Sequence, residues 1–254
     1  MLIPLPQMLV LQALRCLQEL DVCDCPMFLS AYENLPLSSF FIFPSSLHQL
    51  DLRNAGRMRT LEPLSNLTSL TRLFLSRCGE DLRSEGLWPL IIQGHLSGLY
   101  IRGSPKFFVG SDPMPDGGGK PFKLQDVWTD TIEGFLTAPI CTLLSTSLTQ
   151  LVIRGNEEVE RFTEEQEEAL QLLTSLETLV FVDCPNLHCL PAGLCKLPKL
   201  KRLQIFECPT ISSLPKDGLP NSLQELDVSY CRGDELQQQC RNFIRDHPGI
   251  KLKI

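Results

Sequence analysis

Three stretches near the end of the chain repeat one pattern, and they read Leu176-Glu-Thr-Leu-Val-Phe-Val-Asp-Cys184, Leu200-Lys-Arg-Leu-Gln-Ile-Phe-Glu-Cys208 and Leu223-Gln-Glu-Leu-Asp-Val-Ser-Tyr-Cys231. Each stretch is apolar at its first, fourth and sixth positions and ends in cysteine. The starting positions 176, 200 and 223 lie 24 and 23 residues apart. Self-similarity at a period of this length is the signature of a solenoid, in which each repeat adds one supersecondary unit to a stack.

The alternation within each copy predicts a short strand. Side chains alternate between the two faces of a strand, so Leu203 and Ile205 point to one side and Gln204 to the other. One repeat cannot bury its apolar side chains alone, whereas stacked repeats share a core. The period and the L-x-x-L-x-L-x-x-C pattern are those of leucine-rich repeats. We therefore expect an α/β fold, a leucine-rich repeat solenoid (horseshoe) with a parallel sheet on the concave face, an irregular or helical convex side and a C-terminal capping helix.

Copies of the pattern, some of them degenerate, extend over the whole chain. About nine repeats start at Leu17, Leu47, Leu70, Leu96, Leu124, Leu148, Leu176, Leu200 and Leu223. We expect residues 1–254 to form one leucine-rich repeat domain, since an open solenoid of this length can be a single domain. Residues 107–123 contain prolines and a run of three glycines without any periodicity. This segment predicts an irregular excursion from the repeat.

Both ends of the chain depart from the pattern. Residues 234–254 predict a C-terminal cap, because Leu236, Cys240, Phe243 and Ile244 fall on one apolar face of a helix. Asp234 is expected to cap the start of this helix and Pro248 to end it. No polar cap precedes the first repeat, so we expect the natural chain to continue upstream, with a short irregular cap as the alternative.

Cysteine ends five of the repeats, at Cys25, Cys78, Cys184, Cys208 and Cys231. A small side chain at this position, where the chain turns out of the strand, is expected to face the core. Asparagine replaces it in another repeat and is expected to bond loop backbone. We therefore expect buried, reduced thiols, and thiols stay reduced in the cytosol and nucleus. The expected location is cytoplasmic, with the nucleus as the alternative.

Composition argues against two classes of partner. The net charge of −7 and the pI near 5.2 disfavour nucleic acid and anionic membranes. No run of about 18 apolar residues occurs, so no membrane span is expected. The first ten residues lack a basic region and contain two prolines, which makes them a poor signal peptide.

Motifs for catalysis, metals and cofactors are weak. The four histidines are scattered, and no H-E-x-x-H or C-x-x-C motif occurs. Cys184, His188 and Cys189 lie close enough in sequence for a zinc site, but Cys184 is already assigned to the core. Residues 116–121 match a phosphate loop poorly, since Pro121 stands where Ser or Thr must hold magnesium. We therefore expect no enzyme activity, no cofactor and no metal site.

An acidic segment over residues 157–173 predicts a helix. Thr163 and Gln166 match a capping box at its start, and Leu170 belongs to its apolar face. Its glutamates could form a metal site or bind a basic partner, but we interpret them as a solvated face. The sequon at Asn66 is expected to stay unmodified without a secretory signal.

The strand residues that face away from the core form one column along the predicted sheet, because neighbouring strands lie about 4.8 Å apart. Aromatic and apolar residues occupy the middle of this column, and arginines occupy the adjacent one. Such surfaces are typical of protein interfaces, where Trp, Tyr and Arg often dominate binding. The predicted protein-binding residues of the concave face are Phe74, Tyr100, Arg102, Trp128, Val152, Arg154 and Val180. The alternative is that residues 107–123 fold over this column and bury it.

The segments between the strands resemble those of a known family. The resemblance rests on Cys-Pro-Asn-Leu-His-Cys-Leu-Pro-Ala-Gly-Leu at 184–194, on Leu-Pro-Lys-Asp-Gly-Leu-Pro-Asn-Ser-Leu-Gln-Glu-Leu-Asp-Val at 214–228, and on the Ala-Pro-Ile-Cys-Thr-Leu-Leu-Ser run before Leu148. The chain is similar over essentially its whole length to the leucine-rich repeat domain of plant, particularly cereal, NBS-LRR (NLR) disease resistance proteins. These proteins are intracellular immune receptors. The Gly-x-Ile-Pro return of extracellular plant repeats is absent.

The resemblance implies a non-enzymatic role in plant defence. Such a domain helps to recognise a pathogen effector or a guarded host protein, and it restrains a nucleotide-driven switch by autoinhibition. The implied partners are a pathogen effector, a host guardee or the receptor's own nucleotide-binding domain, which is missing from this sequence. Since no phosphate loop is found, binding of ATP or ADP is not implied.

Other function classes stay open. A substrate-recruiting subunit of a ubiquitin ligase also uses cysteine-type repeats, although the Ile-Thr-Asp return and the helical linker-binding box of such subunits are absent. The chain could also be a free-standing adaptor or decoy. An enzyme is the weakest alternative, and it would need an activity that depends on His48, His95, His188 or His247.

Overall fold

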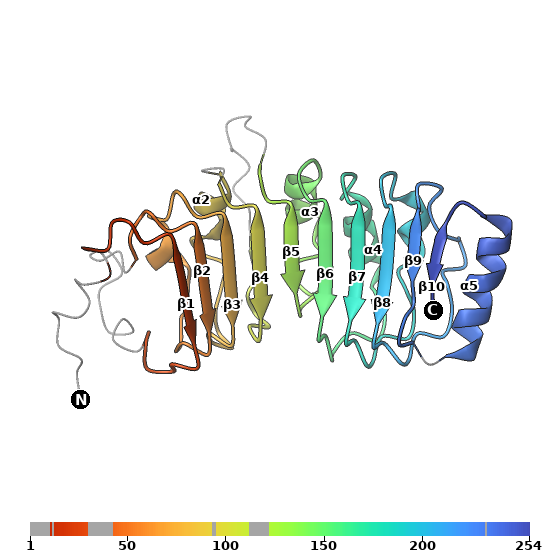
Figure 1. Ribbon diagram of the computed structural model, residues 1–254, viewed down its shortest axis with the longest axis horizontal. Coiled ribbons are helices and arrows are strands. Elements are labelled where there is room, and N and C mark those ends of the chain that lie inside the picture. The colour runs from red at the N-terminus through yellow and green to blue at the C-terminus, as the bar shows by residue number, and fades with distance from the viewer. Residues whose placement is uncertain (1–10, 12, 30–42, 93–94, 112–121, 232) are drawn as a thin grey trace. The chain divides into compact units, whose positions relative to one another are not determined.

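The computed structural model describes residues 11, 13–29, 43–92, 95–111, 122–231 and 233–254. The chain divides into two compact units, Met1–Gln125 and Asp126–Ile254. Each unit is a stack of short parallel strands that are joined by turns and returning segments (Figure 1). Two expectations stay predictions: that residues 1–254 act as one domain, and that the whole chain has a horseshoe shape.

The described strands of the first unit pair in chain order. They are β1 (Glu19–Cys23), β2 (Gln49–Arg53), β3 (Arg72–Ser76) and β4 (Gly98–Arg102). Leu73 pairs with Leu99, and Leu75 pairs with Ile101. Equivalent positions of the repeat therefore lie side by side on neighbouring strands.

In the second unit, too, equivalent repeat positions pair on neighbouring strands. Its strands are β5 (Asp126–Thr129), β6 (Gln150–Arg154), β7 (Thr178–Val182), β8 (Arg202–Phe206), β9 (Glu225–Asp227) and β10 (Lys251–Lys253). All neighbouring pairs are parallel. Strand β5 lies where the degenerate repeat at Leu124 was expected. Strand β10, beside β9, was not expected from the sequence.

Alternate strand residues build the core of each unit. Leu73 and Leu75 are 0% and 1% exposed in the first unit, and Leu203 and Ile205 are both 0% exposed in the second. Gln204, between the latter two, is partly exposed, as a period of two requires. The α/β leucine-rich repeat fold predicted from the sequence is thus confirmed.

A left-handed residue follows the strand in most repeats. Its φ is positive in six non-glycine cases, namely Asp24, Asn54, Arg77, Asp183, Glu207 and Tyr230, and glycine takes the equivalent place at Gly103 and Gly155. This conformation turns the chain sharply out of the strand. The next residue is then directed back toward the core, and this is the position that cysteine prefers.

The residue after this turn links one repeat to the repeat before it. The Cys78 thiol donates a hydrogen bond to the Leu52 carbonyl at 3.2 Å. Asn156 takes the same place in another repeat, where its Nδ2 donates to the Asp130 carbonyl at 2.7 Å and its Oδ1 accepts from the Val159 amide at 2.8 Å. The expectation that asparagine can replace cysteine here by bonding loop backbone is confirmed.

The eleven cysteines are all free thiols, and most of those at the repeat position are buried. Cys25 is the exception and corrects the sequence prediction. It is exposed, and its thiol donates to the Cys23 carbonyl of its own strand at 3.4 Å. The reason is its place in the turn after β1, the first described strand, where no described repeat precedes it.

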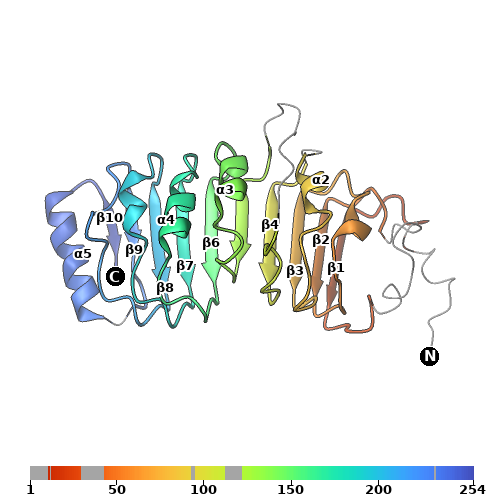
Figure 2. The ribbon, with the colours of Figure 1, turned by 180° about the vertical axis from the view of Figure 1, so that it is seen from behind.

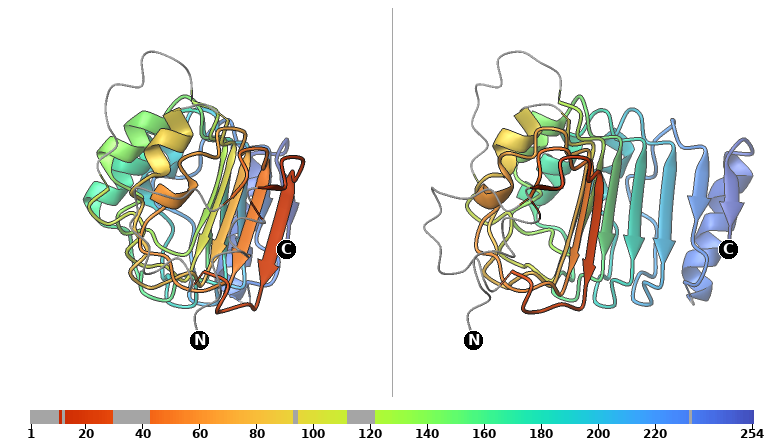
Figure 3. Two further views of the ribbon diagram at one scale, coloured as in Figure 1. Left: turned by 90° about the vertical axis from the view of Figure 1, so that its left-hand side faces the viewer. Right: turned by 60° about the vertical axis from the view of Figure 1, so that its left-hand side comes forward.

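The returning segments carry short helices. The first unit has η3 (Glu62–Leu64) and α2 (Leu87–Ile92); the second has α3 (Ala138–Leu144), α4 (Glu164–Gln171), η4 (Ala192–Lys196) and α5 (Asp234–Asp246). Seen from behind, α2, α3 and α4 lie in front of the strands of their own units (Figure 2). Figure 3 shows these helices on one side of the strands. We call the other side, which corresponds to the predicted concave face, the open face. None of the described helices has the length and apolar character that crossing a membrane requires.

Helix α4 has the predicted capping box. The Thr163 hydroxyl accepts from the Gln166 amide at 3.2 Å, and the Thr163 amide donates to Gln166 Oε1 at 3.0 Å. The helix is shorter than the predicted 157–173, because this cap sets its start after Thr163. Its buried residues are Ala169 and Leu170.

The C-terminal region forms a helix followed by a strand. Helix α5 buries Leu236 and Cys240, as predicted, while Phe243 and Ile244 of the same predicted face stay partly exposed. Asp234 does not cap it: the N-cap is Gly233, and Asp234 is the first helical residue. The helix ends at Asp246, shortly before the proline that was expected to stop it.

The irregular excursion predicted over 107–123 stays a prediction, but its first residues, which form no helix or strand, include two buried phenylalanines. Phe107 and Phe108 are 0% and 2% exposed, and their rings pack edge to face with centroids 4.7 Å apart. These two residues therefore belong to the core of the first unit. Residues 112–121 lie outside the described part of the chain.

Candidate protein-binding face

The open face of the first unit carries a stacked pair of aromatic rings. Phe74 on β3 lies opposite Tyr100 on β4, and the ring centroids are 4.0 Å apart with planes 7° apart. Both residues are partly exposed. A Cβ atom at Gly98 would lie 3.0 Å from the Tyr100 ring. The Tyr100 ring therefore lies over Gly98, and it can do so because glycine has no side chain.

Arginines frame these rings. Arg72 is opposite Gly98 and Arg102 is opposite Ser76, so the two arginines occupy diagonal corners of a six-residue block on β3 and β4. Both are exposed, as is Arg77 in the turn after β3. Within the described residues, none of these three guanidinium groups forms an ion pair. The surface thus joins apolar ring area to exposed positive charge that forms no ion pair with a described carboxylate.

On strand β2 of the same face, an aspartate and an arginine neutralise each other. Asp51 is only 3% exposed, and Arg53 binds it through two nitrogens, with Nε at 2.9 Å from Oδ1. The hydrogen bond with Asp51 is the main cause of the raised pKa of Arg53. Arg53 is therefore already engaged, unlike Arg72 and Arg102.

The open face of the second unit is packed more closely. Trp128 on β5 is partly exposed, and its indole Nε1 donates to Asp126 Oδ1 at 2.9 Å. Val152 and Val180, the next residues in the row, are 2% and 7% exposed. The expectation that these two valines are exposed is therefore wrong, because short branched side chains lie below the level of longer neighbours. Arg154 is exposed, as predicted.

Charges at the far end of this face compensate each other. Lys253 Nζ lies 2.5 Å from a Glu225 carboxylate oxygen and 3.4 Å from Asp227 Oδ2. Asp227 also accepts hydrogen bonds from the amide and the hydroxyl of Ser229, at 3.0 and 2.6 Å. The Lys253 ammonium holds the pKa of Glu225 below its ordinary value.

The predicted binding residues fall into two separate groups. Phe74, Tyr100 and Arg102 lie together on the first unit, while Trp128, Val152, Arg154 and Val180 lie together on the second. Each group is therefore a candidate site by itself.

The start of the 107–123 segment does not cover the open face. The Ser111 hydroxyl accepts a hydrogen bond from Trp88 Nε1 at 3.0 Å and lies 2.8 Å from the Ser84 hydroxyl. Trp88 belongs to α2, which lies on the opposite side of the strands (Figure 2). Whether residues 112–121 cover the face stays a prediction, since they lie outside the described residues.

Sequence reasoning did not single out Arg72, Arg77 or Gly98 as parts of a site. Arg72 and Gly98 occupy a position that the repeat pattern leaves variable, so the pattern carries no information about them. One signal was available, because glycine inside a strand often marks a place where another group approaches closely. At Gly98 that group is the ring of Tyr100.

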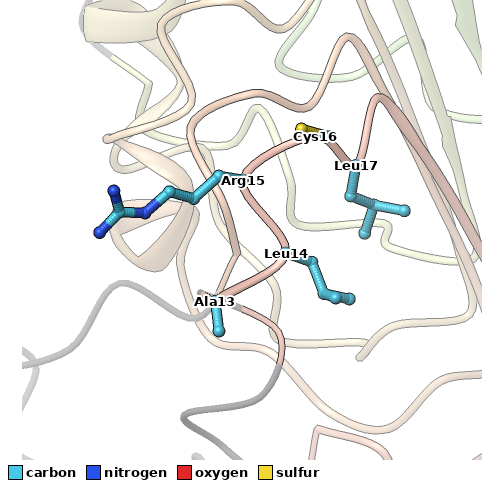
Figure 4. Close-up of a pocket in the computed structure, with 5 residues that line it drawn as sticks. All are labelled: Ala13, Leu14, Arg15, Cys16 and Leu17. Carbon is cyan, nitrogen blue, oxygen red and sulfur yellow. The ribbon is translucent and has the colours of Figure 1, made fainter.

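The residues that were considered for metal binding do not come together as a site in the described part of the chain. In the described part of the chain, no group of three or more His, Cys, Asp or Glu is arranged to hold a metal ion. Cys184 is buried, and its thiol donates to the Ile153 carbonyl at 3.7 Å, while His188 is exposed. An open pocket is lined by residues 13–17, where the Arg15 side chain extends away from Leu17 (Figure 4). This pocket brings no group of polar side chains together.

Comparisons with known proteins find a distant relative in sequence. No protein-family model matches the chain. A search of curated proteins finds similarity to "Disease resistance protein RPS4B" of Arabidopsis thaliana, with 28% identity over 199 residues, which cover 73% of this chain and 16% of that protein. The chain thus spans about one sixth of that relative's length.

Among solved structures, the chain is similar to an LRR protein of Leptospira interrogans, LIC12759. The TM-score is 0.40 and the identity 17%, and the match covers 84% of this chain and 63% of that chain. The repeat pattern and its parallel strands make the chain a leucine-rich repeat protein, and its sequence has a distant similarity to a plant disease resistance protein.

Proposed function

We propose that this chain is the protein-recognition part of a plant intracellular immune receptor of the NBS-LRR class, where it acts in the defence response without catalysing a reaction. Its open face binds a pathogen effector or a host protein, or it contacts the receptor's own nucleotide-binding domain and restrains it. The proposed location is the cytoplasm.

The observation that carries this proposal is the character of the open face. Partly exposed aromatic residues, Phe74, Tyr100 and Trp128, lie beside exposed arginines on rigid strands. Tyr, Trp and Arg are the residue types that most often dominate binding energy at protein interfaces. The similarity to a disease resistance protein supports plant defence as the setting.

The binding part of the proposal is tested by replacing the two anchors. We expect Tyr100→Ala and Trp128→Ala each to weaken partner binding by ~2 kcal/mol or more, because each removes a large partly exposed ring. The measurement is proximity labelling in leaf cells with the chain fused to a biotin ligase, followed by affinity measurement on the purified partner. Glu168→Ala, an exposed change on α4, serves as the matched control and should retain the same partners. Unchanged partner sets in both anchor variants would contradict recognition by the open face.

The receptor part of the proposal is tested by the size of the natural polypeptide. An antibody raised against residues 157–173 should detect a band several times larger than the 28.6 kDa of this chain. A band at about the chain's own mass would favour a free-standing adaptor or decoy instead.

A further inference from the structure

The six-residue block on β3 and β4 has a defined spacing of chemical groups. Its rows are Arg72 with Gly98, Phe74 with Tyr100, and Ser76 with Arg102. Strand residues rise about 3.3 Å each, so the two arginine positions are roughly 13 Å apart along the strands, with the stacked rings between them. The order along the surface is cation, aromatic pair, cation.

An extended peptide has a matching periodicity. Its residues i, i+2 and i+4 point to the same side, and its positions i and i+4 are also about 13 Å apart. A segment with acidic residues at i and i+4 and an apolar or aromatic residue at i+2 would set each group on its complement. Carboxylates would meet the guanidiniums, which bind them in a planar forked geometry, and the central side chain would cover the rings.

The charge around the block favours an acidic partner. Arg72, Arg77 and Arg102 are exposed and form no ion pair among the described residues. On β2 of the same unit, Asp51 is already bound by Arg53. The aliphatic stem of Arg77 lies against Gly103, since a Cβ there would be 3.2 Å from Arg77 Cγ. A second cation therefore lies near Arg102.

We propose that the block formed by Arg72, Phe74, Tyr100 and Arg102 binds an extended acidic segment of a partner protein with the pattern acidic-x-aromatic-x-acidic. This inference rests on the proposed function, because it names the partner chemistry of the same open face. Gly98 is a positioning residue, which lets the Tyr100 ring lie over the strand and stack on Phe74.

Defined peptides test the proposal directly. The probe is a fluorescein-labelled peptide, Gly-Ser-Asp-Ser-Phe-Ser-Asp-Ser-Gly, titrated with the full chain at low salt and followed by fluorescence anisotropy. Three control peptides replace both Asp by Lys, replace Phe by Ser, or place the two Asp residues next to each other. We expect the probe to bind roughly tenfold more tightly than each control, and its affinity to fall as salt is added. Equal binding of the Lys peptide, or no binding of the probe, would overturn the proposal.

Variants of the chain locate the binding. Arg72→Ala and Arg102→Ala should each weaken probe binding about three- to tenfold, and Gly98→Val should weaken it similarly while leaving the arginines in place. The matched control is Arg202→Ala, since Arg202 is an exposed arginine at the position of β8 that corresponds to Arg72 of β3. An equal loss in Arg202→Ala would contradict a site confined to β3 and β4. Far-UV circular dichroism checks that each variant is folded.

Rings beside arginines also suit single-stranded nucleic acid. A fluorescein-labelled oligothymidine is therefore titrated in parallel, and tighter binding of it than of the probe would overturn the assignment to a protein segment. If the probe fails while partner capture in leaf cells still depends on Tyr100, only the acidic-segment inference is wrong. If capture depends on neither Tyr100 nor Trp128, the proposed recognition by the open face is wrong as well.

Discussion

The open faces of the two units use the same strand positions in different ways. In the first unit the central row holds Phe74 and Tyr100, whose rings are partly exposed and stacked. In the second unit the same row holds Val152 and Val180, which are nearly buried. The repeat pattern governs only the residues that face the core, so this row of the open face is free to hold exposed rings in one unit and nearly buried valines in the other.

The comparison extends to buried aspartates at one repeat position. Asp51 in β2 and Asp227 in β9 are 3% and 4% exposed. Asp51 is held by Arg53, whereas Asp227 is held by both donors of Ser229 and by Lys253. The second unit therefore satisfies its buried carboxylate from several sources, and the first relies on one guanidinium.

The largest expected effect is one that the two units should share. Leu73→Ala and Leu203→Ala should each lower the free energy of unfolding by ~2–5 kcal/mol, because each leaves a cavity at a fully buried strand position. Urea denaturation of each variant measures this. A normal unfolding curve for either one would contradict the register of that unit.

Removing the partner of the buried aspartate should lower the free energy of unfolding by different amounts in the two units. Arg53→Ala should cost ~1–3 kcal/mol, since it leaves the Asp51 carboxylate buried without its partner. Lys253→Ala should cost clearly less than Arg53→Ala, because Asp227 keeps both Ser229 donors and the Lys253 ammonium is partly solvated. Both values come from urea denaturation at neutral pH. A larger cost for Lys253→Ala than for Arg53→Ala would reverse this comparison.

The rate of thiol labelling should differ between the first repeat and a later one. Cys25 and Cys78 occupy the same repeat position, but Cys25 is exposed while Cys78 is buried. Burial also raises the pKa of Cys78 to about 11, so little reactive thiolate forms near neutral pH. We expect Cys25 to react with a thiol reagent at least roughly tenfold faster, as measured by mass spectrometry of timed digests. Equal rates would indicate that the first unit opens readily.

The smallest expected effect concerns the pH dependence of the Glu225–Lys253 pair. The lowered pKa of Glu225 means that its contribution is fully present above the ordinary glutamate value of 4.5 and is lost as pH falls through the lowered pKa. The stability difference between wild type and Lys253→Ala should therefore shrink between pH 7 and about pH 3. Urea denaturation of both proteins at the two pH values measures it. A difference that grows in acid would be inconsistent with this pair.

Much of the fold follows from the spacing of apolar residues. The L-x-x-L-x-L pattern located strands at Leu203 and, in degenerate form, at Val127, because a period of two with one buried face leaves little choice of register. The capping box at Thr163 was also readable, since its two hydrogen bonds are local. Strand β10 was not predicted, because its short Lys-Leu-Lys sequence carries no repeat signal. It forms a strand by pairing with β9.

The candidate site was predictable only in part. The chain's own sequence determined which residues alternate away from the core, and so it named Phe74, Tyr100 and Trp128 as residues of the open face. The tertiary structure decided that the Tyr100 ring lies over Gly98 and that Val152 is covered. The physical reason is that core alternation is a property of one strand, whereas exposure and ring stacking depend on the side chains that neighbouring strands place beside each position.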